Sequence, residues 1–167
     1  ALAYALAMQE LKSQASRTFD RIIFASSSGG THAGLAAGAH LESFPGQILG
    51  ISIDEELESL QKVVADIASG IMRLLGNPRS FEPADIHASA DYLGEGYAIM
   101  GAPERNAIQL FARLEGIILD PVYTARAAAG MIDLIRRRVI ARDEAILFWH
   151  TGGAPALWAY TRQLIQP

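Results

Sequence analysis

The chain has 167 residues, of which 50% are hydrophobic and only 19% are charged, whereas an average soluble domain has roughly 25% charged residues. This composition excludes an intrinsically disordered chain. With 14 basic and 18 acidic residues the formal net charge is -4, which lacks the excess positive charge of proteins that bind nucleic acid. No apolar run approaches membrane-spanning length and there is no cysteine, so we expect a cytoplasmic protein without nucleic-acid or membrane partners.

The first half of the sequence predicts an N-terminal helix followed by strand, helix, strand and helix. Residues 1–14 are rich in helix formers, and the apolar run over residues 21–26 predicts a strand. A serine-glycine loop then leads into a helix over residues 31–41. A second apolar run over residues 47–53 precedes a long helix, which we expect Asp54 to cap and residues 76–78 to end.

The second half continues the alternation of apolar runs and helices. It predicts strands over residues 86–92, 117–119 and 145–149, and helices over residues 103–115, 124–138 and 154–164. Apolar strands separated by helices indicate a mostly parallel sheet covered on both faces, which is a three-layer α/β fold.

The loop after the first strand is the strongest candidate for a binding site. In open parallel sheets ligands lie beyond the carboxyl ends of the strands, and this loop reads SSSGGTHAG over residues 26–34. Its hydroxyls, glycines and helix-start amides favour a phosphate group. The alternative is a tight, capped turn that binds nothing. The loop lacks the motifs of a Walker A site, a dinucleotide site or a nucleophile elbow.

Two other loops carry polar groups at expected strand ends. Tyr123 and Thr124 follow the run over residues 117–119, although taken alone this loop is better explained by Thr124 as the N-cap of the next helix. Thr151 and Gly152 follow the last strand. Three such loops at one edge are more than folding alone requires. The four histidines show no metal-ligand spacing, so we expect no catalytic metal.

The segments SSSGGTHAG, GEGY, LEGIILDPVYT and HTGGAPALWAY, in this order, resemble the pyridoxal-phosphate lyases of the D-cysteine desulfhydrase and 1-aminocyclopropane-1-carboxylate (ACC) deaminase family. The resemblance runs from near residue 1 to near residue 160. It implies a tryptophan-synthase-β-like (fold type II) structure with two α/β domains and pyridoxal 5'-phosphate between them. It also implies that residues 1–167 are the C-terminal, mainly large cofactor-binding domain portion of a homodimeric enzyme.

The resemblance assigns roles to individual residues. It implies that Tyr123 and Tyr97 lie in the active site near the substrate, and that Thr124 and Thr151 face the pyridine nitrogen, with Gly152 in the same loop. It further implies a phosphate cradle made of Ser27, Ser28, Gly29, Gly30 and Thr31.

The residue after the tyrosine of DPVY separates the two activities of the resembled family. ACC deaminases have glutamate there, whereas Thr124 matches the D-cysteine desulfhydrases, which release pyruvate, ammonia and hydrogen sulfide by β-elimination. A neutral hydroxyl makes the cofactor ring a weaker electron sink, which suits a good leaving group. The chain departs from the family pattern at Ser27, at Ala98-Ile99-Met100 and at Ala125-Arg126.

The chain offers only two lysines, Lys12 and Lys62, both on predicted amphipathic helices away from the strand-end loops. Schiff-base chemistry needs an active-site amine, which the resemblance places in an N-terminal half that this chain lacks. We therefore expect the missing half to be a partner, together with a small amino-acid substrate, and expect the isolated chain to be inactive. ACC deamination and a non-catalytic phosphate-ligand-binding fragment remain the alternatives.

Overall fold

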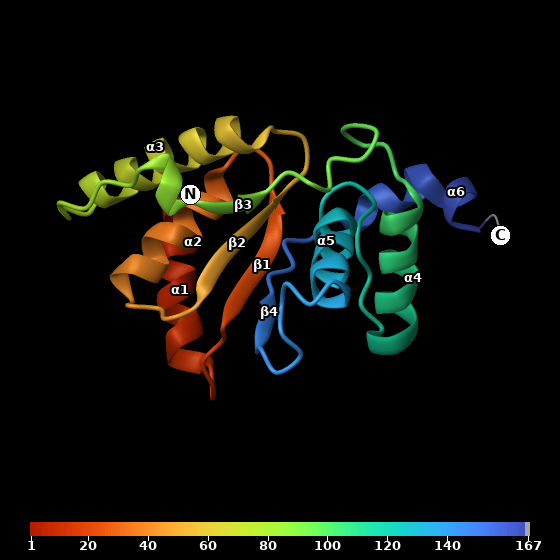
Figure 1. The fold of residues 1–167 in the computed structure, drawn as a ribbon, viewed down its shortest axis with the longest axis horizontal. Helices are drawn as coiled ribbons and strands as arrows, with labels where there is room; N and C mark the ends of the chain where they lie inside the picture. The colour runs from red at the N-terminus through yellow and green to blue at the C-terminus, as the bar shows by residue number, and fades with distance from the viewer. Residues whose placement is uncertain (166–167) are drawn as a thin grey trace.

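A four-stranded parallel sheet forms the centre of the protein (Figure 1). The computed structural model describes residues 1–165. The spatial order is β3-β2-β1-β4, and the strands are β1 (Arg21–Ser26), β2 (Gln47–Ser52), β3 (His87–Ser89) and β4 (Ile146–Phe148). β1 pairs with both β2 and β4, and β2 also pairs with β3. All carboxyl ends therefore meet at one edge of the sheet.

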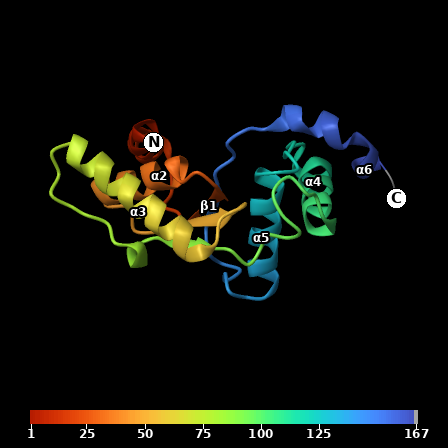
Figure 2. The same cartoon turned by 90° about the horizontal axis from the view of Figure 1, so that it is seen from above.

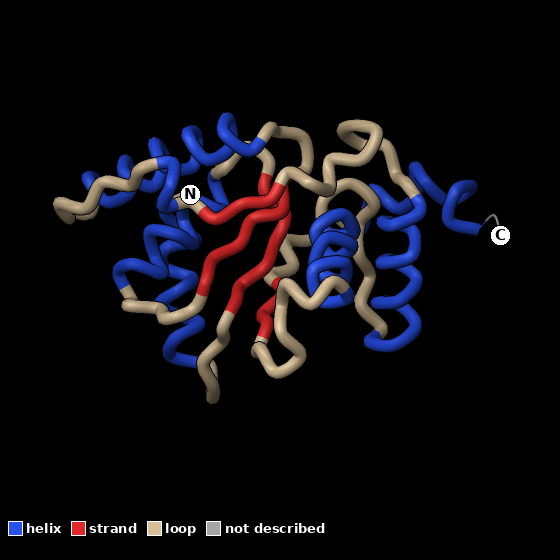
Figure 3. Tube along the Cα trace, viewed as in Figure 1, coloured by secondary structure: helices blue, strands red, loops and turns tan. Residues whose placement is uncertain are grey.

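Helices cover both faces of this sheet (Figures 2 and 3). On one face α2 contacts β2 and packs against α1 and α3; on the other, α5 contacts β1 and β2 and packs against α4. Their bounds are α1 (Leu2–Gln14), α2 (Gly30–Leu41), α3 (Leu57–Leu74), α4 (Ala102–Glu115) and α5 (Thr124–Arg136). Among residues 1–165, no helix combines the length and apolar character needed to cross a membrane.

Alternating side chains along β1 and β2 fill two separate cores. Ile22, Phe24 and Ile48 point toward α1 and α2, where they pack with Met8 and Leu35. The neighbouring residues point to the opposite face and pack against α5; they are Ile23, Leu49 and Ile51. This arrangement confirms the predicted three-layer α/β fold with a parallel sheet.

The start of α3 differs from the prediction. Asp54 does not cap this helix, because α3 begins at Leu57 with Glu56 at its N-cap position. The hydroxyl of Ser52 donates to the Glu55 carbonyl at 2.6 Å and accepts from the Glu55 amide at 3.1 Å. This local turn delays the helix, so the acidic residues that follow β2 lie in a loop rather than in the first helical turn.

Three predicted elements are shorter or absent. β3 ends at Ser89, whose hydroxyl donates to the Asp91 carboxylate at 3.1 Å and so turns the chain away from β2. Residues 117–119 form no strand, because Gly116 ends α4 in the left-handed region (φ 67°) and the Ile117 amide bonds back to Phe111. The last strand covers only β4, residues 146–148.

The predicted C-terminal helix is made of two pieces. It begins as the 3-10 helix η2 (Ala154–Tyr160) and continues as α6 (Thr161–Ile165). A further 3-10 turn, η1 (Pro83–Asp85), precedes β3.

The close packing of α1 on α2 depends on glycine. A Cβ added at Gly38 would lie 2.8 Å from Cβ of Met8 and 2.9 Å from the Ala5 backbone, so Gly38→Ala should lower the free energy of unfolding by about 1–3 kcal/mol. Gly70→Ala, in α3 with no atom within 4 Å of the added carbon, should raise it by about 0.5–1 kcal/mol. Urea unfolding of both variants tests this, and a Gly38→Ala protein as stable as Gly70→Ala would contradict the packing.

Candidate functional site

The turn between β1 and α2 leaves the start of α2 open. Gly29 is the N-cap residue in the left-handed region (φ 79°), and no side chain within the described chain caps the helix. The first hydrogen bond of the helix is donated by the Ala33 amide to the Gly29 carbonyl at 2.8 Å. The amides of the preceding residues therefore keep free donors at the positive end of the helix dipole.

A cavity of about 320 Å³ lies against this turn at the carboxyl edge of the sheet. No heavy atom lies within 4 Å of a Cβ built on Gly30 or on Gly152, so both glycines border open space. The lining residues come from the loop after β1, the start of α5 and the loop after β4: residues 25–32, Tyr123 and residues 151–153. One cavity is therefore lined by all five predicted cradle residues, residues 27–31, and by Tyr123, Thr151 and Gly152.

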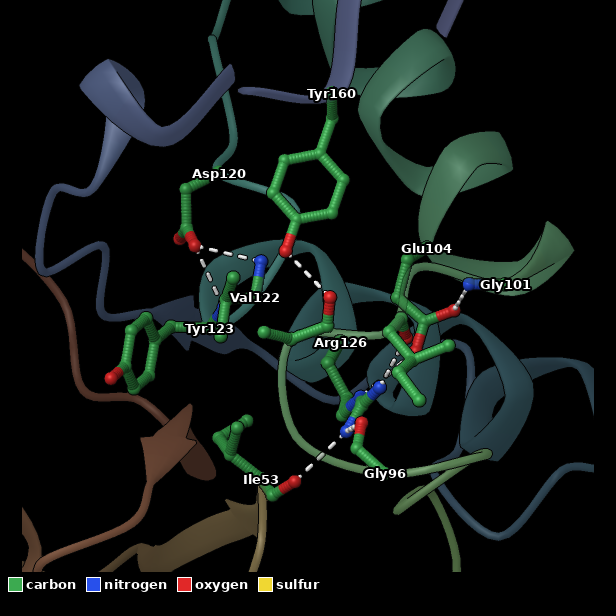
Figure 4. A network of polar contacts seen from close by, with 11 residues as sticks. Ile53, Gly96, Gly101, Glu104, Asp120, Val122, Tyr123, Arg126 and Tyr160 are labelled. Carbon is green, nitrogen blue, oxygen red and sulfur yellow. Dashed lines mark hydrogen bonds and ion pairs between the residues drawn. The ribbon is translucent and has the colours of Figure 1, made fainter. Parts of the chain in front are cut away.

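A buried carboxylate positions Tyr123 at this cavity (Figure 4). Asp120 is 0% exposed, and it accepts hydrogen bonds from the amides of Val122 (2.9 Å), Tyr123 (2.8 Å) and Thr124 (2.7 Å). Thr124 is the first residue of α5, and Val122 and Tyr123 directly precede it. Asp120 therefore supplies the cap that starts the helix and fixes the backbone from which the Tyr123 ring extends.

The loop after β4 packs directly on the same carboxylate. Gly153 has φ 103°, and a Cβ there would lie 2.7 Å from Cγ of Asp120. Only glycine allows this approach. The contact brings Thr151 and Gly152 to the cavity that Tyr123 borders.

The two predicted active-site tyrosines touch each other. The hydroxyls of Tyr97 and Tyr123 are 2.5 Å apart, and their rings meet edge to face at 6.0 Å. The hydrogen bond to Tyr97, followed by burial and the nearby Asp54 and Asp120 carboxylates, raises the pKa of Tyr123 to about 12. At neutral pH Tyr123 therefore keeps its proton and acts as a hydrogen-bond donor, not as a base. Tyr97 itself is 52% exposed.

Two polar contacts around the first loop were not foreseen from the sequence. The Ser27 hydroxyl donates to the exposed Asp54 carboxylate at 2.9 Å, so Asp54 orients a predicted cradle residue. In the cavity wall, Nδ1 of buried His32 lies 3.1 Å from the Ser26 hydroxyl. Asp54 lies two residues after β2, and His32 lies in the first turn of the helix that follows β1. Their position after a strand is the one sequence signal that could have found these contacts.

Thr124 lies outside the cavity lining, and the role that the resemblance implies for it stays a prediction. It is 1% exposed, its hydroxyl donates to Asp120 Oδ1 at 2.7 Å, and the same oxygen accepts from the Asp120 amide at 2.8 Å. It lies in the first turn of α5, after the N-cap residue Tyr123. Its hydroxyl completes the Asp120 cap.

The cavity fits a phosphate group held by neutral donors. Its lining combines the serine and threonine hydroxyls of residues 26–31 with the open amides of α2, and no lysine or arginine is part of it. Lys12 lies at the opposite edge of the sheet, where its amine donates to the Glu42 carbonyl at 2.9 Å, and Lys62 is exposed on α3. Among the described residues, no group of three metal-ligating side chains gathers.

The neutral state of His32 predicts an acid-sensitive stability. Burial, with a smaller contribution from His87, lowers the pKa of His32 from 6.5 to about 3. Between these pH values the unfolded chain binds a proton at His32 that the folded chain does not, so stability is full above pH 6.5 and falls as pH falls, by about 1.4 kcal/mol per pH unit. Urea unfolding at pH 6.5 and 5 should differ by about 1.7 kcal/mol more in the wild type than in His32→Gln. Equal differences would contradict this assignment.

A pair of threonine variants separates the capping position from the cavity position. Thr124→Val leaves the buried Asp120 amide without its acceptor and should lower the free energy of unfolding by about 1–3 kcal/mol. Thr151→Val, the same change at an exposed cavity residue, should alter it by no more than about 0.5 kcal/mol. Thermal or urea unfolding measures both, and similar losses in the two variants would argue against the Asp120 cap.

The sequence matches the pyridoxal-phosphate dependent enzyme family over residues 1–152. It is 39% identical over 166 residues to a D-cysteine desulfhydrase of Yersinia enterocolitica, covering 98% of this chain and 50% of that protein. It is 40% identical over 139 residues to a D-cysteine desulfhydrase of Salmonella paratyphi C, covering 83% of this chain and 42% of that protein. The chain thus spans about half the length of these curated relatives.

Solved structures agree with this match. The crystal structure of an ACC deaminase homologue superposes with a TM-score of 0.88 at 32% identity, covering 98% of this chain and 49% of that one. A fungal L-serine ammonia-lyase from Rhizomucor miehei shares the fold with a TM-score of 0.57 at 15% identity, covering 97% of this chain and 56% of that one. Because the family match extends over most of its length, the chain belongs to the pyridoxal-phosphate dependent enzymes.

Proposed function

We propose that the whole protein is a pyridoxal-phosphate-dependent lyase of small amino acids, and that it converts D-cysteine and water to pyruvate, ammonia and hydrogen sulfide. The observation that carries this proposal is the cavity in which the uncapped start of α2 and the hydroxyl of Tyr123 meet. The relatives named D-cysteine desulfhydrase support the choice of substrate.

In this proposal the loop after β1 holds the phosphate of the cofactor. The amides of Gly29, Gly30 and Thr31 and the hydroxyls of Ser28 and Thr31 would donate to the phosphate oxygens, favoured by the dipole of α2. Ser27 would contribute less, since its hydroxyl already donates to Asp54. The neutral donors hold the anion without a cation, so binding would depend on their fixed geometry.

The loops facing that turn would border the reacting part of the ligand. When bound, pyridoxal phosphate supplies an electron sink for the α-carbon of the substrate. Thr151 and Gly152 would lie beside the ring. Tyr123 Oη would keep its proton and turn it from Tyr97 Oη to the sulfur that departs, while the Tyr97 hydroxyl donates to Tyr123 Oη instead. Because hydrosulfide is a weak base, a hydrogen bond suffices and Tyr123 need not give up its proton.

The covalent anchor of the cofactor would come from outside this chain. Neither Lys12 nor Lys62 lies at the cavity, so we infer that the 167-residue chain alone binds the cofactor reversibly and turns over no substrate. The homodimer and the cytoplasmic location expected from the sequence stay predictions.

ACC deaminase is the second candidate, supported by the likeness to the ACC deaminase homologue. The sequence argument against it depends on Thr124, whose hydroxyl contacts Asp120 rather than the cavity. The choice between the two substrates therefore needs a direct assay.

The full-length protein should form pyruvate and hydrogen sulfide from D-cysteine, and little of the four-carbon 2-oxo acid from ACC. Removing the hydroxyl in Tyr123→Phe should lower kcat about 100-fold, as expected for loss of a positioned donor. Tyr92→Phe is the matched control, since Tyr92 bonds Asp133 at 2.8 Å on α5, away from the cavity, and should keep full activity. Product formed from ACC alone, or none from either substrate, would overturn the proposal; the 167-residue chain is the negative control.

A further inference from the structure

A buried arginine on α5 gathers four groups from three parts of the chain (Figure 4). Arg126 is 1% exposed. Its Nε donates to the Glu104 carboxylate at 2.8 Å, and its Nη1 donates to the carbonyls of Ile53 (2.8 Å) and Gly96 (3.1 Å). Its Nη2 donates to the carbonyl of Ile99 at 2.8 Å. One guanidinium thus joins the end of β2, the loop before α4 and α4 itself.

Two of these carbonyls flank Tyr97. Gly96 and Ile99 lie on either side of it in a segment without helix or strand, and Gly96 (φ 136°) and Ala98 (φ 60°) both have positive φ. A backbone in such conformations needs outside contacts to stay in one arrangement. Apart from Arg126, a hydrogen bond from Tyr160 to the Ala98 carbonyl holds this segment.

The remaining partner of Arg126 is itself fixed. Glu104 is 4% exposed, and its second oxygen accepts from the Gly101 amide at 3.0 Å, at the start of α4. The carboxylate therefore balances the buried guanidinium and ties it to a rigid helix. A planar guanidinium has five N–H donors and can satisfy all four acceptors together, whereas the ammonium of lysine has only three.

We propose that Arg126 is a positioning residue, which holds the loop carrying Tyr97 so that the Tyr97 hydroxyl meets that of Tyr123 at the cavity. Arg126 lies three residues after Tyr123 on the same helix, so one element sets both sides of the contact. The relevance of this contact to catalysis rests on the proposed function, whereas the contact itself can be measured without cofactor or substrate.

The test is the ionisation of Tyr123 in the 167-residue chain, followed by NMR of ¹³C-labelled tyrosine. With a pKa of about 12, roughly a tenth of Tyr123 is ionised at pH 11 in the wild type. Arg126→Lys should raise that fraction several-fold, toward the roughly nine tenths of an unperturbed phenol, as should Tyr97→Phe. The double variant should raise it no further than Tyr97→Phe alone, because both changes remove the same contact.

Arg21→Lys is the matched control. Arg21 pairs with Glu144 at 2.5 Å at the start of β1, so the same chemical change there should alter stability and leave the Tyr123 titration unchanged. If Arg126→Lys fails to fold, Glu104→Gln replaces it in the test. This change weakens the hydrogen bond to Arg126 Nε and should raise the ionised fraction of Tyr123 by a smaller amount. An unchanged Tyr123 titration in a folded Arg126→Lys or Glu104→Gln protein would overturn the proposal.

The proposed lyase function and the proposed role of Arg126 can be disproved independently of each other. In the full-length enzyme, Arg126→Lys should lower kcat with D-cysteine at least tenfold, whereas Arg21→Lys should not. A shifted Tyr123 titration with no lyase activity in the wild type would overturn the proposed function and leave the role of Arg126 standing. A shifted titration with unchanged kcat would overturn the link between Arg126 and catalysis.

Discussion

The buried carboxylate of Asp120 is the interaction on which the geometry of the site depends. A charge at 0% exposure is costly unless hydrogen bonds replace its lost water. Here three consecutive amides and the Thr124 hydroxyl donate to it, and all four donors belong to the first turn of α5 or the residues just before it. The positive end of the α5 dipole adds to this balance. Because Gly153 also presses on the carboxylate, Tyr123 and the loop after β4 are fixed by one group.

The starts of α2 and α5 show opposite solutions to the same physical problem. Every helix leaves unpaired amides at its first turn. In α5 the side chain of Asp120 accepts from the Tyr123 and Thr124 amides, and its backbone carbonyl accepts from the Ala125 amide. In α2 the N-cap is Gly29, which has no side chain to offer, and the cavity lies against the unpaired amides. The chain thus supplies a carboxylate at the start of α5 and none at the start of α2, where open amides of the kind found in phosphate-binding turns border the cavity.

Sequence periodicity predicted the layers and most elements, because each strand and helix buries its own regular apolar face. It failed where one side chain redirects the backbone. The Ser52 hydroxyl delays α3, so that Asp54 lies in a loop and accepts from Ser27, and Gly116 ends α4 so that residues 117–119 form no strand. The sequence also grouped the cavity residues correctly but could not tell that Thr124 turns inward to Asp120. Partner choice among neighbouring polar groups depends on distances that spacing along the chain does not encode.

The helix α5 links these features. It packs on β1 and β2, so the sheet fixes its axis, and its first turn carries Tyr123 and the Asp120 cap. Arg126, which stood out in the sequence only as a departure from the family pattern, extends from the same turn to the Tyr97 loop. That loop has little apolar burial of its own, and Tyr97 is half exposed. An irregular segment thus takes its position from a helix through polar contacts, since its Gly96 and Ile99 carbonyls accept from the Arg126 guanidinium.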